Sequence, residues 1–171
     1  MAVAGMSRLV EFRDRETLDN TLAQEVENRL KSAIEQRGKA YLVVSGGTTP
    51  INLFTELASR AIAWGNITLV LSDERFVCSN HENSNERMLR EQLLRNSAKS
   101  VCLISLIPRP GDARENILIV NQSMVSIPKF DVVLLGMGDD AHTASLFPCA
   151  GETGGVFPFP PLLVPAPPPP P

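Results

Sequence analysis

The stretch AYLVVSGGTTP, residues 40–50, decides the fold expected of this chain. Its first five residues are apolar and rich in β-forming types, which is typical of a strand that is buried in a sheet. The two glycines predict a tight turn, and Pro50 suits the first turn of a helix that continues to about residue 63. Strand, glycine turn and helix in this order are the unit of a parallel sheet covered by helices.

The same plan repeats on either side of this stretch. Apolar residues spaced three and four apart predict a helix over residues 17–37, before the first strand. Short apolar runs predict further strands at residues 67–71, 101–106 and 130–135, and a helix is predicted at residues 85–94. The pattern of residues 113–125 is ambiguous. We therefore expect an α/β fold with a mostly parallel sheet and helices on both faces, similar to a Rossmann fold.

Composition limits the partners that this chain can have. A length of 171 residues with 43% hydrophobic and 20% charged residues suits one globular domain. A net charge of −3 argues against nucleic acid as a partner, and no long apolar run or secretory leader is present, so we expect a cytoplasmic protein without membrane contact. Cys78, Cys102 and Cys149 form no CxxC pair, which argues against both a zinc site and a disulfide framework. We further expect a monomer or a weak homo-oligomer.

The turn after residues 40–44 is the first candidate binding site. Ser45, Gly46, Gly47 and Thr48 lie where a strand passes into a helix, and glycines allow the backbone to approach a ligand closely. Amides at a helix N-terminus donate hydrogen bonds and carry partial positive charge, so phosphate is the expected guest. A turn that only connects strand to helix is the alternative. No lysine follows in the manner of a P-loop, so a nucleotide is not implied.

The second candidate follows the strand at residues 67–71. Arg75 could bind a phosphate or carboxylate through two parallel hydrogen bonds, and Asp73 or Glu74 could hold the guanidinium in place. A solvated charged loop is the alternative. Asn85 could read ligand hydroxyls, although we favour it as the cap of the next helix.

The third candidate is LGMGDDAHTASLFP, residues 135–148, which follows the last predicted strand. His142 stands close in sequence to Asp140, and a carboxylate beside an imidazole sets its tautomer and favours proton transfer near neutral pH. Gly138 lets the turn approach a ligand. His81, the other histidine, lies in a polar loop and is expected to be exposed. A thiol nucleophile at Cys149 is disfavoured, because a small buried cysteine explains that residue more simply.

These motifs resemble those of the 6-phosphogluconolactonases in order and approximate spacing. SGGTTP at Ser45, SDER at Ser72, NSN at Asn83 and the histidine segment carry the resemblance, which spans about residues 12–148. The related glucosamine-6-phosphate isomerases and deaminases share the fold but tend to carry DEY and GHIAFNEP, so Arg75 and HTASLFP favour the lactonases.

The resemblance implies hydrolysis of 6-phospho-D-glucono-1,5-lactone to 6-phosphogluconate, in the oxidative pentose phosphate pathway, without a metal or other cofactor. It implies that His142 assists water, that Asp140 orients His142, and that Arg75 stabilises charge or holds phosphate. Ser45, Gly46, Gly47, Thr48, Asp73, Asn85 and Gly138 would surround the phosphosugar. The alternatives are a catalytically weak sugar-phosphate-binding protein and an amino-sugar-phosphate isomerase or deaminase.

The chain departs from the family pattern in two places. Ala141 stands where the family usually has glycine, which strains the backbone only if this position needs a positive φ, and we expect a small effect. Family members also continue for tens of residues past the histidine segment. Here residues 1–150 are expected to form the lactonase-like domain, with its C-terminal part incomplete, and the Gly/Pro-rich residues 151–171 a disordered tail.

Overall fold

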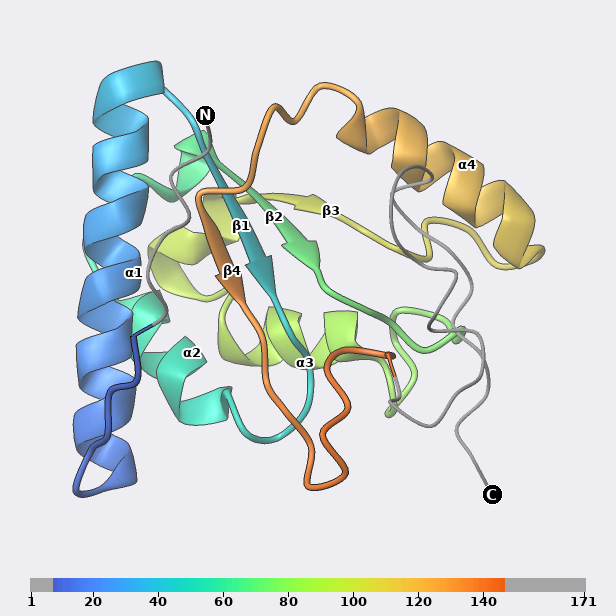
Figure 1. The fold of residues 1–171 in the computed structure, drawn as a ribbon. Helices are drawn as coiled ribbons and strands as arrows, with labels where there is room; N and C mark the ends of the chain where they lie inside the picture. The colour runs from blue at the N-terminus through green and yellow to red at the C-terminus, as the bar shows by residue number, and fades with distance from the viewer. Residues whose placement is uncertain (1–7, 147–171) are drawn as a thin grey trace.

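The computed structural model describes residues 8–146, and a parallel sheet forms their centre (Figure 1). Its strands lie in the order β3-β2-β1-β4, and each pairs with its neighbours in parallel. Their bounds are β1 Ala40–Val44, β2 Ile67–Leu71, β3 Cys102–Ile104 and β4 Val132–Leu134. Val44 pairs with Leu71 on one side and Leu134 on the other, so these three strands end level at their carboxyl ends. The predicted parallel α/β fold is confirmed.

Helices flank this sheet, and Figure 1 shows α1 and α4 on opposite sides of it. The helices are α1 Arg15–Arg37, α2 Ile51–Ser59, α3 Asn85–Gln92 and α4 Ala113–Met124, and short 3₁₀ turns lie at Trp64–Asn66 and Asn96–Ser100. The ambiguous segment 113–125 is thus helical. Helix α1 begins before residue 17 because Asp14 caps it, its carboxylate accepting from the Thr17 amide at 2.7 Å.

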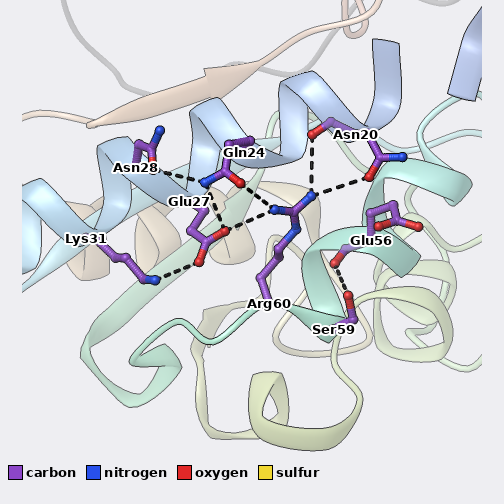
Figure 2. A network of polar contacts seen from close by, with 8 residues as sticks. All are labelled: Asn20, Gln24, Glu27, Asn28, Lys31, Glu56, Ser59 and Arg60. Carbon is purple, nitrogen blue, oxygen red and sulfur yellow. Dashed lines mark hydrogen bonds and ion pairs between the residues drawn. The ribbon is translucent and has the colours of Figure 1, made fainter. Parts of the chain in front are cut away.

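Helix α2 is shorter than predicted, and Arg60 explains why. The apolar pattern predicted a helix to about residue 63, but Arg60 has extended backbone angles and ends the helix after Ser59. Its guanidinium turns back onto α1, where it donates to Gln24 at 2.8 Å and to Glu27 at 3.2 Å (Figure 2). Lys31 also donates to Glu27, and this hydrogen bond is the largest cause that lowers the pKa of Glu27. These contacts fix the C-terminal end of α2 against α1.

The core surrounds the sheet, and helices α1, α2, α3 and α4 all contribute buried side chains to it. Leu42 and Leu69 pair across β1 and β2 and are fully buried, as are Leu30, Phe54 and Leu57 from the helices. Each such side chain contributes about 1.5–3 kcal/mol by burial. Strand β4 keeps only Val132 buried, while Val133 is half exposed.

Some predictions concern residues outside the described part. The tail at residues 151–171 and the environment of Cys149 fall there, so both stay predictions. Cys78 and Cys102 are free and exposed, and His81 is exposed as expected. Within residues 8–146 no helix has both the length and the apolar character needed to cross a bilayer.

Candidate active site

Three turns meet at the carboxyl edge of the sheet, below the strands in Figure 1. The Ser45 amide donates to Leu134 O at 3.1 Å and the Ser72 amide donates to Val44 O at 2.8 Å, so both turns extend the strand ladders. The Ser45 and Ser72 hydroxyls lie 3.0 Å apart and share a hydrogen bond. The turns that follow β1, β2 and β4 are therefore physically joined.

A cavity of about 550 Å³ opens between these turns. Every residue proposed from the sequence except Asp140 lines it: Ser45, Gly46, Gly47, Thr48, Asp73, Arg75, Asn85, Gly138 and His142. The volume suits a small ligand such as a phosphorylated sugar. No cluster of three or more metal-ligating side chains occurs in the described part of the chain.

The loop from Ser45 to Pro50 presents its backbone to this cavity. Gly47 has a φ of +90°, a conformation that favours glycine. The amides of residues 46–49 find no acceptor among residues 8–146, and the loop leads directly into α2. Four unsatisfied donors at a helix N-terminus form a concave site of partial positive charge that suits an anion.

Asp73 links the turn after β2 to the histidine loop. Its Oδ1 accepts from the Ser72 hydroxyl at 2.9 Å and its Oδ2 accepts from the Ser145 hydroxyl at 2.7 Å. Both carboxylate oxygens therefore have hydrogen-bond donors within the protein. Asp73 lines the cavity, but its contacts favour a role in holding the loops together over direct contact with phosphate.

Asn85 is not the helix cap that we favoured from the sequence. Ser84 caps α3 by accepting from the Arg87 amide, and the Glu74 carboxylate accepts from the Asn85 amide at 2.8 Å. Asn85 is the first helical residue and only 3% exposed. Its side chain is thereby free to face the turns instead of the helix end.

The Asn85 side chain positions Arg75. Its Oδ1 accepts from Arg75 Nη1 at 2.7 Å, and its Nδ2 donates to Asp73 O at 3.2 Å. Arg75 Nη1 also donates to Asn83 O at 2.9 Å. Gly46 lies against this amide, since a Cβ on Gly46 would stand 2.1 Å from Asn85 Cγ. The glycine thus makes room for the group that orients the arginine.

His142 and Asp140 form a pair in the third turn. His142 Nδ1 lies 2.5 Å from Asp140 Oδ1, and the His142 amide donates to the same oxygen at 3.2 Å. The side-chain hydrogen bond to His142 is the main cause that lowers the pKa of Asp140. The predicted pairing of carboxylate and imidazole is therefore present, and it leaves Asp140 ionised at neutral pH.

Backbone geometry around His142 is tight. The Gly138 amide donates to His142 O at 2.9 Å, and a Cβ on Gly138 would stand 2.2 Å from the imidazole Cε1. Ala141 has a φ of +64°, so the condition under which an alanine here strains the backbone is met. A left-handed alanine lowers the folding stability by about 1–2 kcal/mol. The backbone that positions His142 is therefore strained at Ala141.

Helix α1 contributes residues that the sequence did not reveal as part of the site. The residues of α1 that line the cavity are Arg15, Leu18, Asp19 and Leu22. The spacing of Leu18 and Leu22 indicated only a buried helix face, and Arg15 lies before the predicted helix start. Nothing local in the sequence shows that this helix end reaches the glycine loop.

Known proteins share both this sequence and this architecture. The model of the family described as glucosamine-6-phosphate isomerases/6-phosphogluconolactonase matches residues 13–159. A 6-phosphogluconolactonase of Pseudomonas putida is 39% identical over 140 residues, covering 82% of this chain and 58% of that protein. One of Mesorhizobium japonicum is 41% identical over 142 residues, covering 82% of this chain and 60% of that protein.

A solved structure gives the same result. The crystal structure of a 6-phosphogluconolactonase from Shewanella baltica superposes with a TM-score of 0.79 at 40% identity, covering 84% of this chain and 62% of that one. The chain thus spans about 60% of the length of the relatives that it matches. By sequence and by fold, it belongs to the glucosamine-6-phosphate isomerase/6-phosphogluconolactonase family.

Proposed function

We propose that this protein hydrolyses 6-phospho-D-glucono-1,5-lactone to 6-phosphogluconate. The observation that carries the proposal is the pairing of His142 with Asp140 at a cavity that also holds Arg75 and the unsatisfied amides of residues 46–49. Relatives named 6-phosphogluconolactonase support the same reaction. The site thus combines a base, a cation and an anion-binding loop within one cavity.

His142 acts as the general base. Donation of the Nδ1 proton to Asp140 selects the tautomer whose lone pair lies on Nε2. This nitrogen takes a proton from water as the water oxygen attacks the lactone carbonyl carbon. When the bond from that carbon to the ring oxygen breaks, the imidazolium returns the proton to the ring oxygen. Asp140 stays ionised and stabilises the imidazolium, and no covalent intermediate forms.

Arg75 stabilises the negative charge that develops on the carbonyl oxygen. Its Nη1 is held by Asn83 O and Asn85 Oδ1, so the guanidinium is oriented before substrate arrives. The loop that includes Ser45, Gly46, Gly47 and Thr48 receives the phosphate through its backbone amides. The proposal gives a positioning role to three further residues, which hold the turns around the cavity in place: Asp73, Asn85 and Gly138.

The remaining expectations are part of the same proposal. The proposed reaction uses water and groups of this chain, and it needs no metal or other cofactor. Its partner is a small phosphosugar lactone, without nucleic acid, and the protein acts in the cytoplasm as a monomer or weak homo-oligomer. The net negative charge supports the absence of a nucleic-acid partner. The relatives named 6-phosphogluconolactonase support the cytoplasmic location.

Lactone opening, followed as 6-phosphogluconate formed above the uncatalysed rate, tests the proposal. We expect clear acceleration by the full chain, and a loss of about 10²–10⁴ in kcat for His142→Ala. Asp140→Asn should lower kcat by at least tenfold, whereas Asp139→Asn is the matched control, because the exposed Asp139 has no hydrogen-bond partner among the described residues.

Three outcomes would contradict the proposal or the base that it assigns. Binding of 6-phosphogluconate without any acceleration would leave a sugar-phosphate-binding protein. Release of ammonia from glucosamine 6-phosphate would instead identify a deaminase. Unchanged activity in His142→Ala would refute the assigned base even if the lactone is opened.

A further inference from the structure

Arg15 is a cation at the active-site cavity that the proposed mechanism does not use. It opens helix α1, and its side chain lines the cavity beside the loop of residues 45–50. Its Nη2 donates to the Thr49 carbonyl oxygen, and its Nε donates to Asp19 at 3.2 Å. A guanidinium has five N–H donors. The other three find no acceptor among residues 8–146.

Helix stability does not explain an arginine at this position. The first turn of a helix favours acidic side chains, as Glu16 illustrates, and disfavours cations. Asp19 explains how Arg15 is held: its side chain is 5% exposed, and a buried carboxylate needs a positive partner. The pair therefore keeps the guanidinium, itself 51% exposed, at the cavity instead of in bulk solvent.

Arg13 provides a comparison on the same segment. Its side chain is 86% exposed, pairs only with Asp14 and does not line the cavity. Two arginines two residues apart thus differ in their surroundings, and only one of them faces the glycine loop.

We propose that Arg15 binds the phosphate group of the sugar phosphate, together with the backbone amides of residues 46–49. This inference rests on the proposed function and deepens it. A guanidinium whose donors point at an anion forms paired, charge-assisted hydrogen bonds with phosphate oxygens. The Thr49 carbonyl that Arg15 contacts belongs to the same loop as those amides, so both sets of donors act on one side of the cavity. Arg75 then contacts the lactone carbonyl and not the phosphate group.

Substrate selectivity tests this assignment in the full chain. Arg15→Gln should lower kcat/KM for 6-phosphogluconolactone by about tenfold or more, mainly through KM, and change kcat/KM for unphosphorylated glucono-1,5-lactone by less than about twofold. Arg15→Lys should recover part of the loss, since it restores the charge without the planar fork. Arg13→Gln is the matched control and should behave as the wild type.

Calorimetric binding of 6-phosphogluconate and gluconate provides a second measurement. Arg15→Gln should lose about tenfold in affinity for the phosphorylated acid only. An equal loss on both ligands, or no loss, would overturn the proposal. If the wild type opens no lactone, the proposed function fails, while these affinities still decide the role of Arg15. If the wild type binds 6-phosphogluconate no more tightly than gluconate, the proposed role of Arg15 in phosphate binding is also overturned.

Discussion

Replacing Gly46 with alanine would test whether Asn85 holds the active-site turns together. The new Cβ would stand 2.1 Å from Asn85 Cγ and Oδ1, well inside contact distance. The Asn85 side chain cannot move into solvent without losing stabilising contacts. Asn85 is 3% exposed, and its amide is hydrogen-bonded to Arg75 and to the Asp73 carbonyl oxygen. The substitution therefore displaces the amide that orients Arg75.

The expected cost follows from these contacts. Overpacking of a buried site costs about 1–3 kcal/mol, and each of the two hydrogen bonds of Asn85 contributes about 1 kcal/mol. We expect Gly46→Ala to lower the free energy of unfolding by about 3–5 kcal/mol. At about 2–4 °C per kcal/mol for a chain of this size, Tm falls by roughly 6–20 °C.

A double-mutant cycle measured by urea denaturation isolates this effect. Asn85→Ala removes the atoms that the new Cβ would meet, so Gly46→Ala should cost less than about 1 kcal/mol in that background. Gly47→Ala is the control, since nothing lies within 4 Å of its added Cβ and its φ is +90°. It should cost about 1–2 kcal/mol by backbone strain alone, with or without Asn85. An equal cost of Gly46→Ala in both backgrounds would refute the reasoning.

Three further substitutions probe other parts of the structure. Gly138→Ala should lower lactone turnover at least tenfold with little change in KM, because its Cβ would displace the His142 ring; retained turnover would show that the ring position is not critical. Ala141→Gly should raise the free energy of unfolding by about 1 kcal/mol, measured in urea, by relieving a left-handed alanine. Glu27→Gln should lower it by about 1–2 kcal/mol at pH 7 through weaker hydrogen bonds with Lys31 and Arg60. Because the folded-state pKa of Glu27 is lowered, its contribution is present above the unfolded value of 4.5 and is lost as pH falls through the folded value, so the two urea curves should converge in acid.

Local sequence patterns were sufficient for most of the fold. The apolar runs in β1 and β2 were predicted at their observed bounds, because strands buried in the centre of a sheet carry continuous apolar residues. The end of α2 was missed, because Arg60 leaves the helix to bond with α1, a tertiary contact that helical periodicity does not register. The strands at the two edges, β3 and β4, proved shorter than their apolar runs.

The sequence predicted many of the residues that line the cavity, but not the contacts that connect them. Gly-rich turns, Arg75 and His142 stand out in sequence because each follows a continuous apolar run. Asp73 stood out too, yet its bond to Ser145 spans 72 residues of chain and could not be inferred from spacing. Arg15 was missed for the same reason, since its surroundings depend on where helix α1 ends relative to a loop far along the chain.

Strand order explains why these connections exist and where the cavity lies. The chain moves outward from β1 to β2 to β3 and then returns to place β4 on the other side of β1. In sheets of this kind the direction of winding reverses between the first and fourth strands, and a crevice opens at their carboxyl ends. The cavity occupies this position, and the turns after β4, β1 and β2 line it. The turn after β3 lies at the far edge of the sheet and contributes no lining residue, so three of the four strand ends within residues 8–146 face the cavity.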